Sequence, residues 1–201
     1  MKFGIIADIH EDVHNLRKAL QRFRQEGVEQ VVALGDVCDT GEHLDQTVDL
    51  LRQANAIGVW GNHDLGLCHE VDERTRRRFP HQVHDFMRAL APRLEVESCL
   101  FTHGFPFWDA TDPCIYYVGG KPEEPESLDR CFRASTVRVM FLGHFHRWVL
   151  VTTAGHHRWA GESPIRLDEG SRWLVVVAAV CDGWCAVFDT ADGLLTPLRL
   201  V

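Results

Sequence analysis

Strand-like and helix-like patterns alternate over the first third of the chain, and this alternation constrains the fold more than any other feature. Short apolar runs predict strands at residues 2–7, 30–34 and 56–60. Between them, apolar residues recur every three or four positions and predict helices at residues 13–25 and 43–54. A β-α-β-α-β order is typical of a parallel sheet that is covered by helices.

The pattern changes along the rest of the 201-residue chain. We expect mostly helix at residues 65–91, a loop rich in aromatic residues and prolines at 105–125, and another helix at 126–134. Apolar runs bounded by glycine or aspartate turns predict further strands. These lie at residues 94–96, 99–102, 137–142, 149–153, 164–167, 172–180, 184–189 and 195–200. Because no repeat, low-complexity tract or long linker interrupts the sequence, we expect one domain spanning residues 1–201.

Composition and charge exclude several classes of protein. Hydrophobic residues make up 45% of the chain and charged residues 25%, which is ordinary for a soluble globular protein. A net charge of -8 disfavours duplex nucleic acid as a partner, because DNA attracts basic surfaces. No apolar run is long enough to span a bilayer, and the first residues lack a signal-peptide pattern. We therefore expect a cytoplasmic protein without a membrane partner.

Side chains of the kinds that bind metals directly follow five of the predicted strands. They lie in the clusters Asp8-Ile9-His10, Gly35-Asp36-Val37-Cys38-Asp39, Gly61-Asn62-His63-Asp64, His103-Gly104 and Gly143-His144-Phe145-His146. In open α/β sheets, functional groups collect at the carboxyl ends of the strands. We therefore expect these side chains to lie close together at one edge of the sheets.

The chemistry of these clusters indicates a metal centre. Carboxylate and imidazole groups suit divalent transition metals such as manganese, iron, zinc or nickel. A carboxylate can bridge two such ions, and a pair of ions can hold a phosphoryl group and ionise a water molecule. The seven cysteines are scattered, odd in number and without a CxxC pair, so they predict neither disulfides nor a thiolate metal site.

In this order the clusters resemble the pattern of the calcineurin-like metallophosphoesterase superfamily, which is D-x-H, G-D-x-x-D, G-N-H-D/E, an isolated H, and G-H-x-H. The resemblance covers residues 8–146, and the β-rich tail agrees with the second sheet of that family. It implies an α/β fold, a four-layer α-β-β-α sandwich of two mixed β-sheets with helices on the outer faces. It also implies a hydrolase with two divalent metal ions, manganese being expected first and iron, zinc or nickel being the alternatives.

The resemblance assigns a role to each residue of the clusters. The metal ligands would be Asp8, His10 and His146 at one ion, Asn62, His103 and His144 at the other, and Asp36 as the bridge between them. A hydroxide that bridges the ions would attack the phosphorus. His63 would contact the substrate phosphate and protonate the leaving oxygen, and Asp64 would orient His63.

Departures from the pattern bear on the substrate. Asp39-Thr40-Gly41 stands where the protein phosphatases of the superfamily have D-R-G, and Asp64 stands where they have glutamate. The chain is more similar to small bacterial phosphodiesterase-type members, although Glu11-Asp12 replaces their Gly-Asn. Residues 177–180 also replace their N-P-G-S-like turn. We expect a small phosphoester or nucleotide substrate, with phosphodiesters favoured over monoesters.

Two other functions are compatible with the same resemblance. One is a phosphohydrolase that acts on nucleotides or dinucleoside polyphosphates. The other is a protein-interaction scaffold that keeps the fold but has lost catalysis. Such a scaffold should lack His63 or a metal ligand, and here the whole set is present, so we favour the enzyme.

Two segments outside the clusters have alternative interpretations. Aromatic residues from Phe105 to Trp108, next to His103, would either stack on a nucleobase or pack a small core of their own, which we favour. The basic run at residues 74–78 predicts a solvated helix face, and binding of phosphate by one of its arginines is the alternative.

Overall fold

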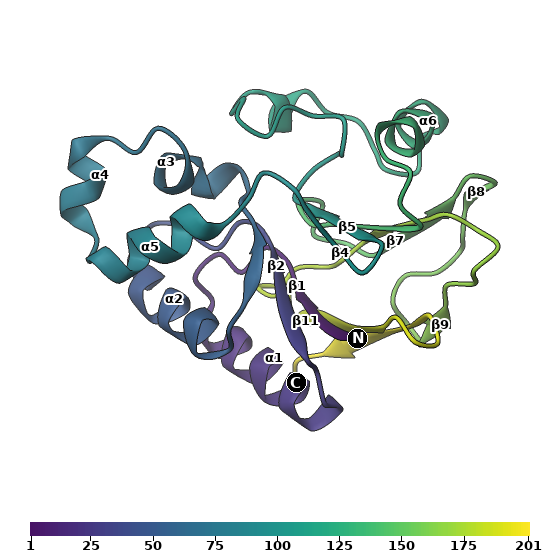
Figure 1. Cartoon of the computed structure of the whole chain (residues 1–201), viewed down its shortest axis with the longest axis horizontal. Helices are drawn as coiled ribbons and strands as arrows, with labels where there is room; N and C mark the ends of the chain where they lie inside the picture. The colour runs from purple at the N-terminus through teal and green to yellow at the C-terminus, as the bar shows by residue number, and fades with distance from the viewer.

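Two six-stranded β-sheets face each other in the computed structural model, which describes residues 1–201 (Figure 1). Helices α1 (Val13–Glu26), α2 (Leu44–Gln53) and α5 (His81–Ala89) lie outside the first sheet, and α6 (Pro125–Ala134) lies outside the second. Both sheets contain parallel and antiparallel strand pairs. The predicted four-layer sandwich of two mixed sheets is therefore confirmed.

The first sheet has the strand order β3-β2-β1-β11-β12-β9. Its strands are β1 (Lys2–Ile6), β2 (Gln30–Leu34), β3 (Ile57–Val59), β9 (Ile165–Arg166), β11 (Trp184–Asp189) and β12 (Leu194–Arg199). β1, β2 and β3 are parallel, as the β-α-β-α-β pattern predicted, whereas β11, β12 and β9 pair antiparallel. Strands from the two ends of the chain thus share one sheet.

The second sheet has the strand order β4-β5-β6-β10-β7-β8. Its strands are β4 (Leu94–Val96), β5 (Cys99–Thr102), β6 (Val139–Leu142), β7 (Val149–Thr152), β8 (Gly155–His156) and β10 (Trp173–Val176). β5, β6 and β10 are parallel to one another. Each sheet therefore has a parallel half whose strands end at a common edge.

Apolar side chains form three layers that hold the sandwich together, because successive residues of a strand face opposite sides of its sheet. Between the sheets, Phe3 of β1 meets Phe101 of β5 with ring centroids 5.3 Å apart. Outside the first sheet, helix α1 buries Phe23, and outside the second sheet, helix α6 buries Leu128 and Cys131. Helix α1 begins where the Asp12 side chain accepts a hydrogen bond from the backbone N–H of Asn15.

The two largest differences from the predicted elements lie at residues 65–91 and 172–180, and the short strand β8 was not predicted. The predicted helical region is divided into α3 (Leu65–Cys68), α4 (Glu73–Arg78) and α5. The predicted strand at residues 172–180 ends at Val176, although residues 177–180 remain buried and apolar. There the chain leaves the second sheet, and the Val180 N–H donates to Ala7 O, directly after β1 of the first sheet. The apolar run alone did not predict that residues 177–180 leave β10 and approach Ala7.

The remaining helical segments are short. They are η1 (Asn62–Asp64) directly after β3 and η2 (Ile115–Tyr117) in the loop before α6. None of the helices combines the length and the apolarity that are required to cross a lipid bilayer.

Candidate metal centre

The ends of five strands bring the predicted acids and histidines together at one edge of the sandwich. These loops carry Asp8 and His10 after β1, Asp36 after β2, Asn62 and His63 after β3, His103 after β5, and His144 and His146 after β6. Backbone hydrogen bonds tie the loops to one another, from Asp8 N–H to Gly35 O and from Gly143 N–H to His103 O. The site is thus assembled from both sheets.

Asp36 lies at the centre of this arrangement. Its Oδ2 is 3.3 Å from His103 Nε2 and 3.7 Å from His10 Nε2. Its Oδ1 accepts a hydrogen bond of 2.9 Å from the backbone N–H of His63. One carboxylate oxygen therefore faces histidines from both sides of the site.

One group of potential ligands lies on the His10 side of Asp36. The Nε2 atoms of His10 and His146 are 3.3 Å apart, and His146 Nε2 is 3.5 Å from Asp8 Oδ1. Both oxygens of Asp8 accept hydrogen bonds of 3.0 Å from the backbone N–H of His144. His146 Nε2 therefore lies within 3.5 Å of ligand atoms of both Asp8 and His10, the residues that the resemblance groups with it.

A second group lies on the His103 side. His103 Nδ1 donates to Leu34 O at 2.7 Å, which leaves Nε2 to face Asn62 Oδ1 at 3.1 Å and Asp36. The ligand atoms of Asp36, His103 and His144 all lie within 4.8 Å of one another. The structure thus brings the predicted ligands Asn62, His103 and His144 together.

Two glycines allow Asp36 to sit in this position. Gly35 has a φ of 89°, and a Cβ there would lie 2.7 Å from His103 Nδ1. A Cβ on Gly61 would lie 2.1 Å from Asp36 Oδ1. The glycines of the G-D and G-N motifs are therefore required by the close approach of these loops.

The backbone is strained around the same residues. Asp8, His10, Asp36, His144 and His146 all have positive φ values, between 46° and 67°. Such conformations are costly for residues with side chains and cluster at functional sites. These conformations allow two side chains of one loop, such as Asp8 and His10, both to face the site.

The charges at the centre favour a bound cation. Burial raises the pKa of Asp8 to about 7, although His103 opposes this shift. Burial also opposes the charge of His103, but Asp36 and Asp8 raise its pKa to about 9. Histidines are the only ion-pair partners of the Asp8 and Asp36 carboxylates. Buried carboxylates and imidazoles without lysine or arginine form a donor set that fits divalent ions.

His144 stays neutral, because burial and the neighbouring His103 lower its pKa to about 4. Burial likewise lowers the pKa of His10. Neutral imidazoles keep a lone pair available for a metal. Burial alone would raise the pKa of Asp36, but His103 and the backbone N–H of His63 hold it well below its ordinary value. Asp36 is therefore ionised.

The contacts of Asp64 differ from the role predicted for it. Its buried carboxylate accepts hydrogen bonds from the backbone N–H groups of Val37, Cys38 and Gly61. The carboxylate beside the His63 ring is instead that of Asp39, with Oδ1 3.8 Å from His63 Nδ1. Asp64 directly follows His63 in the short helix η1, and the turn of this helix directs the Asp64 side chain into the protein. Asp64 thus holds the two motif loops together and does not contact the His63 imidazole.

Glu11 is a residue whose role the sequence did not reveal. Its buried carboxylate accepts hydrogen bonds from the N–H groups of Asp39, Gly41 and His43 and from the thiol of Cys38. These bonds outweigh burial and lower the pKa of Glu11. Glu11 therefore fixes the loop that carries Asp39. The only signal was an acid directly after the D-x-H motif.

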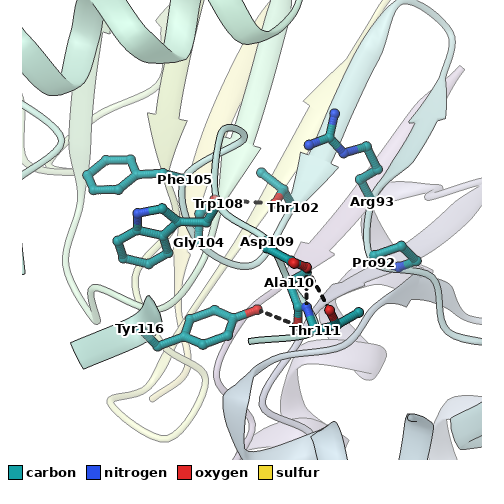
Figure 2. A pocket seen from close by; sticks show the side chains of 10 residues that line it. All are labelled: Pro92, Arg93, Thr102, Gly104, Phe105, Trp108, Asp109, Ala110, Thr111 and Tyr116. Atoms are coloured by element: carbon teal, nitrogen blue, oxygen red, sulfur yellow. Dashed lines mark hydrogen bonds between the residues drawn. The ribbon is translucent and has the colours of Figure 1, made fainter. Parts of the chain in front are cut away.

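A cavity of about 220 Å³ lies beside His103 (Figure 2). It lies between the aromatic loop and Thr102 and Gly104, the residues before and after His103. Trp108 and Tyr116 form its aromatic wall, and Arg93 lies at the other end. The Tyr116 ring also packs against the rings of His103 and His144, with centroids 5.7 and 5.5 Å apart. The cavity and the second ligand group thus share one aromatic side chain.

Most of the aromatic loop packs against itself, as we favoured. Phe105 is buried, with its ring centroid 5.1 Å from that of Phe107 and 4.8 Å from that of Trp108. The basic run behaves as a solvated helix, because α4 buries none of its residues. Its Arg78 donates to Thr40 O.

Known proteins of one enzyme family are similar to this chain. Residues 1–170 match the calcineurin-like phosphoesterase superfamily domain. An uncharacterised protein of Methanocaldococcus jannaschii is 33% identical over 188 residues, which cover 86% of this chain and 73% of that protein. A phosphodiesterase of the same organism is 37% identical over 73 residues, which cover 34% of this chain and 39% of that protein.

A solved structure agrees in fold. The metallophosphoesterase from Sphaerobacter thermophilus superposes with a TM-score of 0.80 at 20% identity, covering 100% of this chain and 89% of that one. The family match includes all five clusters of acids and histidines. The chain therefore belongs to the calcineurin-like phosphoesterase superfamily and is a divalent-metal-dependent phosphoesterase, either a phosphodiesterase or a phosphatase.

Proposed function

We propose that this enzyme hydrolyses phosphodiesters with two divalent metal ions that share Asp36. The observation that carries the proposal is the central position of this carboxylate, between His103 Nε2 and His10 Nε2. The ligands would be Asp8, His10 and His146 for one ion, and Asn62, His103 and His144 for the other. When bound, the ions supply an activated water and neutralise charge on the phosphoryl oxygens. Manganese suits this set of carboxylate, amide and imidazole donors.

We assign to His63 the role of general acid that protonates the leaving oxygen. Its backbone N–H donates to Asp36, so the residue is anchored beside the proposed bridge. Its side chain is nevertheless 39% exposed, and its Nδ1 lies 3.8 Å from Asp39 Oδ1. An imidazole that lies beside a carboxylate and is open to solvent can act as a general acid for a leaving group. Asp39, which Glu11 holds in place, is therefore a positioning residue for His63.

A diester fits the surroundings of the site better than a monoester. The open side, where the side chains of His63 and His146 are 39% and 38% exposed, offers no arginine from the G-D-x-x-D loop, because residue 40 is threonine. A dianionic terminal phosphate would find few cationic partners there beyond the metals. A diester carries one negative charge and needs fewer.

The cavity beside His103 offers room for the second ester group. Its volume of about 220 Å³ and its aromatic wall suit a planar group (Figure 2). Trp108 and Tyr116 would then contact a base or ring by stacking. This wall also favours the second candidate, a nucleotide or dinucleoside polyphosphate. Trp108→Ala should raise the KM of a diester several-fold and leave that of p-nitrophenyl phosphate unchanged.

The substrate class is tested by comparing bis-p-nitrophenyl phosphate with p-nitrophenyl phosphate under saturating Mn²⁺. We expect the higher kcat/KM for the diester. A clear preference for the monoester would overturn the diesterase assignment while leaving the proposed metal centre intact. The Asp36→Asn variant, purified in the same way, controls for a contaminating phosphatase. Dinucleoside polyphosphates belong in the same assay, since their preferential cleavage would favour the second candidate.

A further inference from the structure

A cysteine outside the family pattern lies beside the His10 and His146 side chains. Nitrogen atoms of these two histidines and the Sγ of Cys181 all lie within 4.8 Å of one another. Cys181 lies after β10 and directly follows residues 177–180, which stand where the small relatives have their N-P-G-S-like turn. Three ligand atoms thus converge from three different loops.

The backbone holds Cys181 in this place. The Val180 N–H donates to Ala7 O at 2.8 Å, and the Cys181 N–H donates to Asp8 O at 3.3 Å. The loop after β10 is therefore fastened to the strand end that carries Asp8. Any movement of that strand end carries Cys181 with it.

The side chain of Cys181 has one polar neighbour. Its Sγ lies 3.9 Å from His146 Nδ1, and the same nitrogen is 3.4 Å from Asp182 Oδ2. The thiol is half-buried, and its only backbone hydrogen-bond partner is the N–H of its own residue. It is therefore free to turn toward an ion between the histidines.

The distances allow a common ion. With metal–nitrogen bonds of about 2.0–2.1 Å and metal–sulfur bonds of about 2.3 Å, neighbouring ligand atoms of a tetrahedral site lie roughly 3.3–3.6 Å apart. The Nε2 atoms of His10 and His146 already have a separation of 3.3 Å. Because the 3.9 Å contact of Sγ is with His146 Nδ1, a common ion requires the sulfur to turn so that its separation from the histidine nitrogens, at most 4.8 Å now, falls to about 3.6 Å.

We propose that Cys181 is a ligand of the ion held by His10 and His146 and that it selects a thiophilic ion, such as zinc, at this position. The proposal rests on the proposed function to the extent that both use this ion. On binding, the thiol releases its proton to solvent, because a coordinated thiol is bound as thiolate. The other position, formed by Asn62, His103 and His144, has no sulfur donor and remains suited to manganese.

Cadmium tests the proposal, because a cadmium thiolate has a charge-transfer band in the near ultraviolet. Metal-free protein, kept reduced, is titrated with Cd²⁺ while absorbance and bound metal are recorded. Wild type should develop the band with the first equivalent. Cys181→Ser should lack it and bind Cd²⁺ roughly tenfold or more weakly, with Mn²⁺ affinity unchanged. Cys114→Ser, at an exposed cysteine of the aromatic loop, is the matched control and should keep the band.

The outcomes separate this proposal from the proposed function. Wild type that binds Cd²⁺ without a band, or a band that persists in Cys181→Ser, would overturn the role of Cys181. Failure of wild type to bind Cd²⁺ would overturn it as well. A Cys181-dependent band in a protein that cleaves neither mono- nor diesters would instead leave the ligand established and refute the proposed function.

Discussion

The two halves of the proposed metal centre differ in how deeply the protein buries a histidine of each, although Asp8, in the half of His10 and His146, is itself fully buried. In the half of His103 and His144, the His103 side chain is 1% exposed and Tyr116 packs against both rings. In the half of His10 and His146, the His146 side chain is 38% exposed.

The side chains of His103 and His146 are accordingly held in place in different ways. His103 is fixed by hydrogen bonds to Leu34 O and Asn62 Oδ1 before any ion binds. His146 has only polar side chains around it, at distances of 3.3 Å or more. The buried half is therefore preorganised by the fold, whereas the exposed half depends on its ion for precise geometry.

The largest effect should come from Asp36, the residue that the two halves share. Asp36→Asn removes the charge that faces both histidine groups, so we expect loss of both ions and of essentially all turnover. Metal content after dialysis and the rate of diester cleavage measure this. Retention of two tightly bound ions by the variant would show that the halves are independent.

His63 lies near His10 and Asp36 but is not one of the proposed ligands, so it should affect turnover alone. We expect His63→Ala to keep both ions and to lose about 10²–10⁴-fold in kcat, the usual range for a general acid. An assay with a leaving group of low pKa should recover part of the loss, because such a group needs no proton. Loss of metal on this substitution would make His63 a ligand.

Substitution of one histidine in each half sharpens the contrast directly. His103→Ala breaks buried hydrogen bonds and should lower the free energy of unfolding of the metal-free protein by about 1–3 kcal/mol. His146→Ala, at an exposed position, should change it by less than about 0.5 kcal/mol. Urea unfolding with a chelator present measures both, and equal losses would contradict the difference in preorganisation.

The pH dependence of the metal-free protein should report two buried groups, His103 from one half and Asp8 from the other. The pKa of His103 is raised from 6.5 to about 9, so its contribution to stability is complete below pH 6.5 and is lost as pH rises through 9. Asp8, whose pKa is raised from 3.8 to about 7, lowers stability as pH rises from about 4 to 7 and adds nothing to the change above pH 7, which belongs to His103. We therefore expect the Tm of metal-free protein to fall between pH 7 and 9.

Metal binding should remove this fall in Tm. Binding at His103 Nε2 displaces its proton, so the affinity of the buried half should rise about tenfold per pH unit below pH 9. Calorimetry in buffers of different ionisation enthalpy measures the proton released. Binding without proton release would mean that His103 is not a ligand.

Local patterns predicted the parallel strands and the acids and histidines at their ends, and the family resemblance supplied the four-layer sandwich and the proposed ligand set. Short apolar runs ending in Asp8, Asp36 or His103 indicate strands with polar ends, and parallel strands end at a common edge. The ion set itself remains a prediction. The sequence did not reveal the partners of Glu11 and Asp64, because their hydrogen bonds join loops that are distant along the chain.

The position of Cys181 was hidden for a similar reason. Residues 177–180 continue an apolar run, and only the three-dimensional structure shows that they leave β10 and run to Ala7. A cysteine that ends such a run resembles any small buried residue. Its neighbours His10 and His146 come from opposite sheets.

The central claim is that Asp36 joins two ions, and anomalous diffraction from a crystal of the manganese-loaded protein tests it most directly. We predict two anomalous peaks, one among Asp8, His10 and His146 and the other among Asn62, His103 and His144, with the Asp36 carboxylate in contact with both. A single peak, or an Asp36 side chain turned away from the two groups, would contradict the account.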